Sequence, residues 1–148
     1  MRATIEQLRD ISQRCNNHEQ LRPEQLSWLG LVLSDFLTRR CSSVDEAFGL
    51  RFARGGIPWW LEDAMRQRDT ALRELANRHF IGMSVSAQAS GIRSLAVRYG
   101  ASTWRFDRDR SSLPEGYAGT THEWLWRAFA SGAPMPIGER QLRHVLGR

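Results

Sequence analysis

Lysine is absent from this sequence, and all 21 of its basic side chains are arginine. Without lysine, the chain cannot contain the Gly-rich phosphate loop that ends in Lys-Ser or Lys-Thr. A guanidinium group stays charged and holds phosphate or carboxylate through two parallel hydrogen bonds. A GC-rich gene also encodes its basic residues as arginine, and these arginines are spread along the whole chain. The absence of lysine is therefore explained either by a need for guanidinium groups that bind anions or by codon usage. Codon usage is the simpler explanation.

Cysteine is scarce, because Cys15 and Cys41 are the only two. Two cysteines are too few for a disulfide scaffold, which favours a reducing compartment, and we expect the protein to be cytoplasmic. The most apolar stretch, residues 26–37, contains Asp35 and is shorter than the roughly 20 residues of a membrane span. The charged first ten residues do not resemble a signal peptide. We therefore expect no membrane partner.

No segment alternates apolar and polar residues in the way that a half-buried strand does. The chain has 148 residues, of which 41% are hydrophobic and 25% charged, and this composition excludes a disordered or collagen-like protein. A length of this kind fits one domain. We therefore predict an all-α fold, a compact bundle of about six short-to-medium helices that forms a single helical domain over residues 1–148.

Helical periodicity and helix-start signals divide the chain into segments. Capping-box patterns begin at Thr4, Ser43 and Thr120, where a hydroxyl residue is followed three positions later by Glu or Gln. Pro23 and Pro58 suit the start of the helices that follow them. The expected helices are 4–15, 23–40, 59–79, 120–130 and 138–146, with a short helical turn at 43–48.

The segment 85–110 has two interpretations. Its periodicity favours one long helix. The apolar face of that helix would carry Ile92, Leu95, Tyr99 and Phe106. However, Gly91 and Gly100 each cost about 1 kcal/mol relative to alanine in a helix, which favours a kink or a restart near Gly100.

Charge is distributed unevenly along the sequence. Residues 1–63 carry 8 Arg and 9 acidic side chains, a formal charge of −1. Residues 64–148 carry 13 Arg and 7 acidic side chains, a formal charge of +6. Such asymmetry indicates an anionic partner for the basic half of the chain, such as nucleic acid. The alternatives are self-complementarity between the two halves and no functional role for the asymmetry.

Arginine and tryptophan side chains of the basic half are the candidate nucleic-acid contacts. They are Arg98, Arg105, Arg108, Trp104, Arg140 and Arg143. The first three arginines share one face if 85–110 is a continuous helix, and the last two share a face of the final helix. Guanidinium groups would neutralise phosphates, and the exposed indole would stack on a base. The last two helices are also consecutive, as in a helix-turn-helix, although the turn at 131–137 is longer than usual.

These residues predict a small basic binding protein without catalytic activity, which associates with nucleic acid through an arginine-rich helical face. The alternative is a protein–protein adaptor or inhibitor that docks on an acidic partner, or a homodimer, through exposed Trp and Arg. The chain has six tryptophans, and Trp59-Trp60 and Trp124-x-Trp126 cannot all point into one core. Interfaces are rich in both residue types, although tryptophan also shields the rim of small helical cores.

The sequence contains no pattern that identifies a catalytic or metal site. Cys15-x-x-His18 has the spacing of half a zinc site but lacks a second ligand pair. Cys41 follows two arginines that would lower the pKa of its thiol, but no nucleophile motif surrounds it. Asp107 and Asp109 lie among arginines, so we expect ion pairs on a solvated face. We expect no cofactor and no metal.

Arg68 and His79 form a candidate anion pocket, because both lie on the apolar face of the helix at 59–79. Such a pocket would serve an enzyme or a small-molecule binder, the third class of function. The structural alternative is that a buried Arg68 pairs with an acidic side chain. His79 would then complement the dipole at the C-terminus of its helix.

Overall fold

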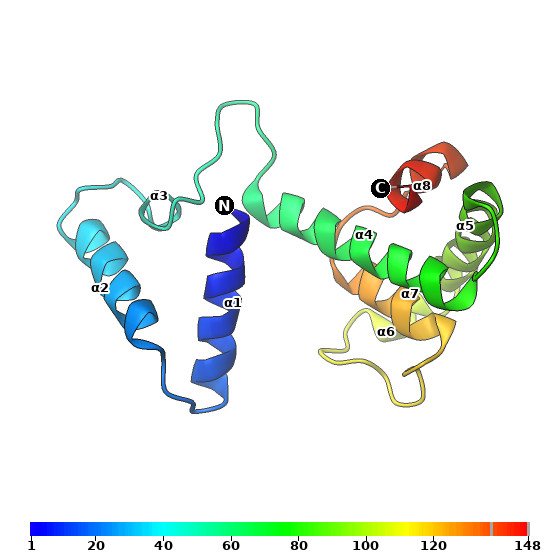
Figure 1. The fold of residues 1–148 in the computed structure, drawn as a ribbon, viewed down its shortest axis with the longest axis horizontal. Helices are drawn as coiled ribbons and strands as arrows, with labels where there is room; N and C mark the ends of the chain where they lie inside the picture. The colour runs from blue at the N-terminus through cyan, green and yellow to red at the C-terminus, as the bar shows by residue number, and fades with distance from the viewer. Residues whose placement is uncertain (137, 148) are drawn as a thin grey trace. The chain divides into compact units, whose positions relative to one another are not determined.

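All regular structure in the described part of the chain, residues 1–136 and 138–147, is helical in the computed structural model (Figure 1). The helices are α1 (Arg2–Asn16), α2 (Pro23–Leu37), α3 (Val44–Ala47), α4 (Trp59–His79), α5 (Val85–Ala101), α6 (Trp104–Asp107), α7 (Thr121–Ala130) and α8 (Glu139–Leu146). The all-α class is confirmed. Eight helices are described instead of about six, partly because 85–110 forms two. None of the described helices is long and apolar enough to cross a membrane.

The chain divides into two compact units, Met1–Trp59 (unit 1) and Trp60–Arg148 (unit 2), and each is described by itself. The expectation of a single domain over residues 1–148 stays a prediction. The unit boundary also redistributes the charge: unit 1 has 8 Arg and 7 acidic side chains, and unit 2 has 13 Arg and 9. The basic excess of unit 2 is therefore +4, smaller than the +6 of residues 64–148.

In unit 1, Asp10 ties α1 to the start of α2. Its carboxylate accepts hydrogen bonds from Gln25 Nε2 at 2.6 Å and from Arg22 at 3.0 Å. Gln25 is almost fully buried, and its Oε1 accepts from the backbone N–H of Arg22 at 3.0 Å. This is the bond that the third helical residue makes in a capping box, and it satisfies the N–H at the start of α2.

The helix α2 is apolar on several sides. Val32 is buried, whereas Leu26, Leu33 and Leu37 lie on another side, and Leu37 is 76% exposed. A helix that is hydrophobic all round is usually covered by other protein. These exposed leucines give unit 1 an apolar face.

Four helices of unit 2 build its core. The largest fully buried side chains are Leu72 and Leu75 on α4, Ile92 on α5, Leu125 on α7 and Leu142 on α8. Burying an aliphatic side chain of this size contributes about 1.5–3 kcal/mol. Alanines of α4, α5 and α7 fill the spaces between them, so the helices can approach closely.

Two glycines of α5 lie beneath phenylalanine rings. A Cβ added at Gly91 would overlap the Phe80 ring, and one at Gly100 would lie 3.2 Å from two ring atoms of Phe129. Both glycines are inside the helix. The absence of a side chain at these two glycines lets the phenylalanine rings pack against the helix backbone. Neither glycine interrupts α5.

The helix break in 85–110 lies at Ser102, two residues after Gly100. Ser102 leaves helical geometry with φ −121° and ψ −70°, and its Oγ donates to the carbonyl of Arg98 at 2.7 Å. The interpretation of 85–110 as one long helix is therefore wrong, and the alternative with a restart is confirmed. Because the chain turns here, Phe106 leaves the apolar face expected for it and is 67% exposed.

The three expected capping boxes have different outcomes. Ser43 Oγ accepts from the backbone N–H of Glu46 at 3.1 Å and caps α3 as predicted. Thr4 lies inside α1, which begins at Arg2, so the box predicted there is wrong. Thr120 precedes α7 but makes no side-chain cap bond. Glu123 instead accepts from the backbone N–H of Gly119 at 2.7 Å.

Alanine at two helical glycines should shift stability in opposite directions. We expect Gly91→Ala to lower the free energy of unfolding by about 1 kcal/mol, since overpacking costs about 1–3 kcal/mol and helix propensity returns about 1. Gly30 lies in α2 with no atom within 4 Å of an added Cβ. Gly30→Ala should therefore stabilise by about 0.5–1 kcal/mol. Thermal unfolding followed by circular dichroism measures both, and stabilisation at Gly91 would contradict the ring contact.

Candidate nucleic-acid interface

The charges of α4 are balanced and largely paired. The helix carries four Arg and four acidic side chains. Glu62 pairs with Arg66 at 3.3 Å and Glu74 with Arg78 at 2.8 Å, both with i,i+4 spacing. Because these charges compensate one another, α4 contributes little to the basic excess of unit 2.

The excess lies mostly on α5 and α8. Together these two helices carry four arginines and one acidic residue. Figure 1 shows them side by side, and they pack against each other. The single carboxylate, Glu139 at the start of α8, lies 4.0 Å from Arg93 of α5. We call the outward side of these two helices, with Arg93, Arg98, Arg140 and Arg143, the α5/α8 surface.

On α5, small side chains separate the two arginines. A shallow hollow of about 440 Å³ is lined by Arg93, Ser94, Val97, Arg98 and Ala101. Val97 is 63% exposed. Side chains this small let an extended anionic chain approach the helix while the guanidinium groups reach it from either side.

On α8, the apolar and charged sides are clearly separated. Leu142 and Val145 are buried, while Arg140 and Arg143 are exposed. Among the described residues, no ion pair is formed by the side chains of Arg98, Arg140 or Arg143. The main packing partner of α8 is α5. The helix-turn-helix arrangement of the last two helices, which the sequence allowed, stays a prediction.

The other predicted contacts lie on and after α6. Arg105 and Arg108 are exposed, but the break at Ser102 removes the continuous helical stripe that was expected to join them to Arg98. Trp104 is half-buried, with its ring 6.2 Å from the ring of Tyr99 and 5.4 Å from that of Phe129. Its indole is therefore engaged with the core of unit 2, although the sequence placed it as an exposed stacking surface.

Asp107 is the centre of a buried polar cluster that the sequence analysis missed. It is 4% exposed, and its Oδ2 accepts from the hydroxyls of Tyr99 at 2.9 Å and Tyr117 at 2.8 Å. Arg110 lies 3.7 Å from its Oδ1. The expected ion pair is present, but Asp107 is buried and does not lie on a solvated face. The carboxylate holds the end of α6 against α5 and the loop before α7.

This cluster raises the pKa of both tyrosines. For Tyr99 the first cause is burial, followed by the hydrogen bond to the Asp107 carboxylate, which favours the protonated hydroxyl. For Tyr117 the causes are the same, and the Arg110 guanidinium opposes them. The ring of His122 packs on both, 5.7 Å from Tyr99 and 5.2 Å from Tyr117.

Arg68 and His79 do not meet in a pocket. Arg68 is 4% exposed, its Nη2 lies 2.6 Å from Asp69 Oδ1, and its Nη1 donates to the carbonyl of Pro134. The guanidinium therefore has structural partners, as in the alternative interpretation of Arg68. His79 is exposed at the C-terminal end of α4. Eleven residues of helix separate the two by about 16 Å along the axis.

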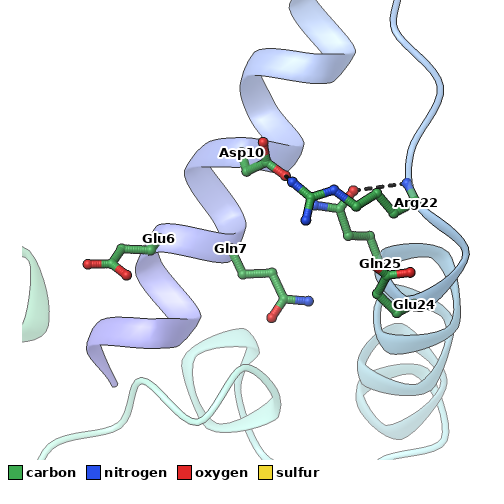
Figure 2. Close-up of a pocket in the computed structure, with 6 residues that line it drawn as sticks. All are labelled: Glu6, Gln7, Asp10, Arg22, Glu24 and Gln25. Atoms are coloured by element: carbon green, nitrogen blue, oxygen red, sulfur yellow. Dashed lines mark hydrogen bonds and ion pairs between the residues drawn. The ribbon is translucent and has the colours of Figure 1, made fainter.

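Unit 1 contains a polar hollow of about 500 Å³ between α1 and α2, drawn in Figure 2. It is lined by Glu6, Gln7, Asp10, Arg22, Glu24 and Gln25. The Gln25 hydrogen bond, with Arg14 and Arg22 nearby, holds the pKa of Asp10 below its usual range. Asp10 is thus an ionised carboxylate whose partners belong to the fold.

The two cysteines, Cys15 and Cys41, lie in unit 1. Cys15 and Cys41 are free. Burial, and then the Glu46 and Asp35 carboxylates, raise the pKa of the Cys41 thiol, so the lowering expected from its two neighbouring arginines is wrong. Across the described residues, no group of three or more His, Cys, Asp or Glu is placed to hold a metal ion.

Comparison of the chain with protein families, with curated proteins and with solved structures finds no significant match. Support for the candidate interface therefore comes from the geometry and charge of this chain alone.

The two tyrosines should ionise only well above the ordinary tyrosine pKa of about 10. Because their folded pKa is raised, their hydroxyls stabilise the fold below pH 10, and this contribution is lost as the pH rises further. Tyr117→Phe should lower the free energy of unfolding at neutral pH by about 1–3 kcal/mol. Tyrosinate absorbance measures the ionisation, and a midpoint near pH 10 in the folded protein would contradict the buried cluster.

Proposed function

We propose that this protein binds nucleic acid without catalysing a reaction, and that the α5/α8 surface makes the phosphate contacts. The observation that supports this most directly is that Arg98, Arg140 and Arg143 are exposed without an ion-pair partner among the described residues, while α4 in the same unit pairs its charges. Unpaired surface guanidinium groups remain available for an external anion.

The mechanism is neutralisation of the phosphate backbone. Each arginine that contacts a phosphate releases condensed counterions, and a planar guanidinium group can hold two phosphate oxygens at once. Because such contacts read no bases, they give affinity and register without sequence specificity. A cytoplasmic location, which we also propose, agrees with the two free cysteines.

A protein partner is the second candidate. Trp60, in unit 2, is 59% exposed. An acidic protein, or a second copy of this chain, that docks on this side chain would make the protein an adaptor or an inhibitor. Its complex should depend on Trp60 and should show little salt dependence if apolar contacts dominate.

Binding to labelled duplex and single-stranded DNA and RNA between about 50 and 200 mM salt tests the first proposal. With three or four phosphate contacts, log K should fall with log salt with a slope near −3 on duplex DNA. Replacing Arg98, Arg140 and Arg143 with alanine should make that slope shallower by about 0.9 for each phosphate that is no longer neutralised.

Arg40→Ala is the matched control, because Arg40 is 75% exposed and pairs with Asp35 at 3.4 Å, outside the α5/α8 surface. It removes the same charge and should leave the slope within error of the unmodified protein. Absence of binding at the lowest salt would refute the proposal. Equal effects of Arg40→Ala and Arg98→Ala would show that net charge acts, and not this surface.

A further inference from the structure

Phe106 is the exposed aromatic side chain of α6. It is 67% exposed, whereas the neighbouring Trp104 is half-buried against Tyr99 and Phe129. Among the described residues, no other aromatic ring packs on Phe106. Most of the Phe106 ring is therefore accessible to a partner.

One arginine packs on this ring, and a second follows in the sequence. The guanidinium carbon of Arg105 lies 4.7 Å from the ring centroid, within the range of a cation–π contact. The side chain of Arg108, 64% exposed, follows at the end of α6 and lies 3.9 Å from the Asp109 carboxylate. The Arg105 guanidinium group thus lies next to an aromatic face, and the Arg108 side chain is exposed two residues after Phe106.

The platform is fixed to the core. Asp107, the next residue, is held by the hydroxyls of Tyr99 at 2.9 Å and Tyr117 at 2.8 Å. Trp104, two residues before Phe106, packs on Phe129. The backbone on both sides of Phe106 is therefore anchored, so little conformational entropy would be lost when a partner contacts the ring.

We propose that Phe106 is a stacking platform for an unpaired nucleobase, and that Arg105 and Arg108 hold the adjoining phosphates. This inference rests on the proposed function and narrows its ligand to single-stranded nucleic acid. Aromatic side chains next to a positively charged groove are how proteins hold single strands, because every base has a face that can stack. In a duplex the bases are already stacked on one another, so Phe106 would have no base to receive.

The test compares binding of a labelled single strand and its duplex to Phe106 variants. Phe106→Ala should weaken binding of the single strand about 5- to 150-fold, the range found when an aromatic side chain that stacks on a base is replaced by alanine. Binding of the duplex should change less than about twofold. The salt slope should stay constant, because no charge is removed.

Three further variants and their thermal unfolding separate stacking from apolar contact and from loss of folding. Phe106→Leu keeps apolar volume without an aromatic face and should lose binding as Phe106→Ala does, while Phe106→Trp should retain it. Ile81→Ala is the matched control, since Ile81 is 78% exposed between α4 and α5. Thermal unfolding of every variant shows whether it is folded, and little loss is expected at such exposed positions.

The outcomes distinguish the two proposals. If the unmodified protein binds neither strand nor duplex, the proposed function fails and this inference fails with it. If the protein binds but Phe106→Ala leaves single-strand affinity unchanged, or weakens strand and duplex equally, only the stacking platform is refuted. Retained binding in Phe106→Leu would likewise overturn stacking, because that side chain has no aromatic face.

Discussion

The packing of unit 2 depends on how closely two phenylalanine rings approach the backbone of α5. Phe80 lies so close to Gly91 that a Cβ would overlap its ring, and Phe129 lies close enough to Gly100 to make a Cβ there a tight contact. Through these rings, the residue after α4 and the helix α7 pack on the inner side of α5. With that side occupied, α8 packs alongside, and the outer side of α5 keeps small and charged residues.

The arginines of unit 2 fall into two groups, those paired within the fold and those without an ion pair among the described residues. On α4, and at the buried Arg68, guanidinium groups have partners within the fold, so their charge serves structure. On the α5/α8 surface, Arg93 lies 4.0 Å from the Glu139 carboxylate, and no ion pair of Arg98, Arg140 or Arg143 is found in the part of the chain that the structure describes. A surface that keeps charge without compensation is destabilised slightly by self-repulsion and gains from an anionic ligand. This difference between neighbouring helices is more informative than the net charge of the chain.

The sequence predicted helices well where the pattern is local. For α4 the expected range 59–79 matches the structure, because its apolar stripe and i,i+4 ion pairs act within one helix. The glycines of 85–110 allowed a restart near Gly100, but the burial of Asp107 could not be found in this way. Asp107 accepts a hydrogen bond from Tyr117, ten residues further on, and a helical pattern does not report contacts across a loop. The exposure of Phe106 follows from the turn at Ser102, and a helical wheel therefore placed it on the wrong side.

The arginine-only composition has a chemical consequence for the α5/α8 surface. Acetylation of lysine, which cells use to remove charge from basic surfaces, has no target in these 148 residues. An anionic ligand on this surface would therefore respond to ionic strength and to competing anions, and lysine acetylation would not weaken its binding.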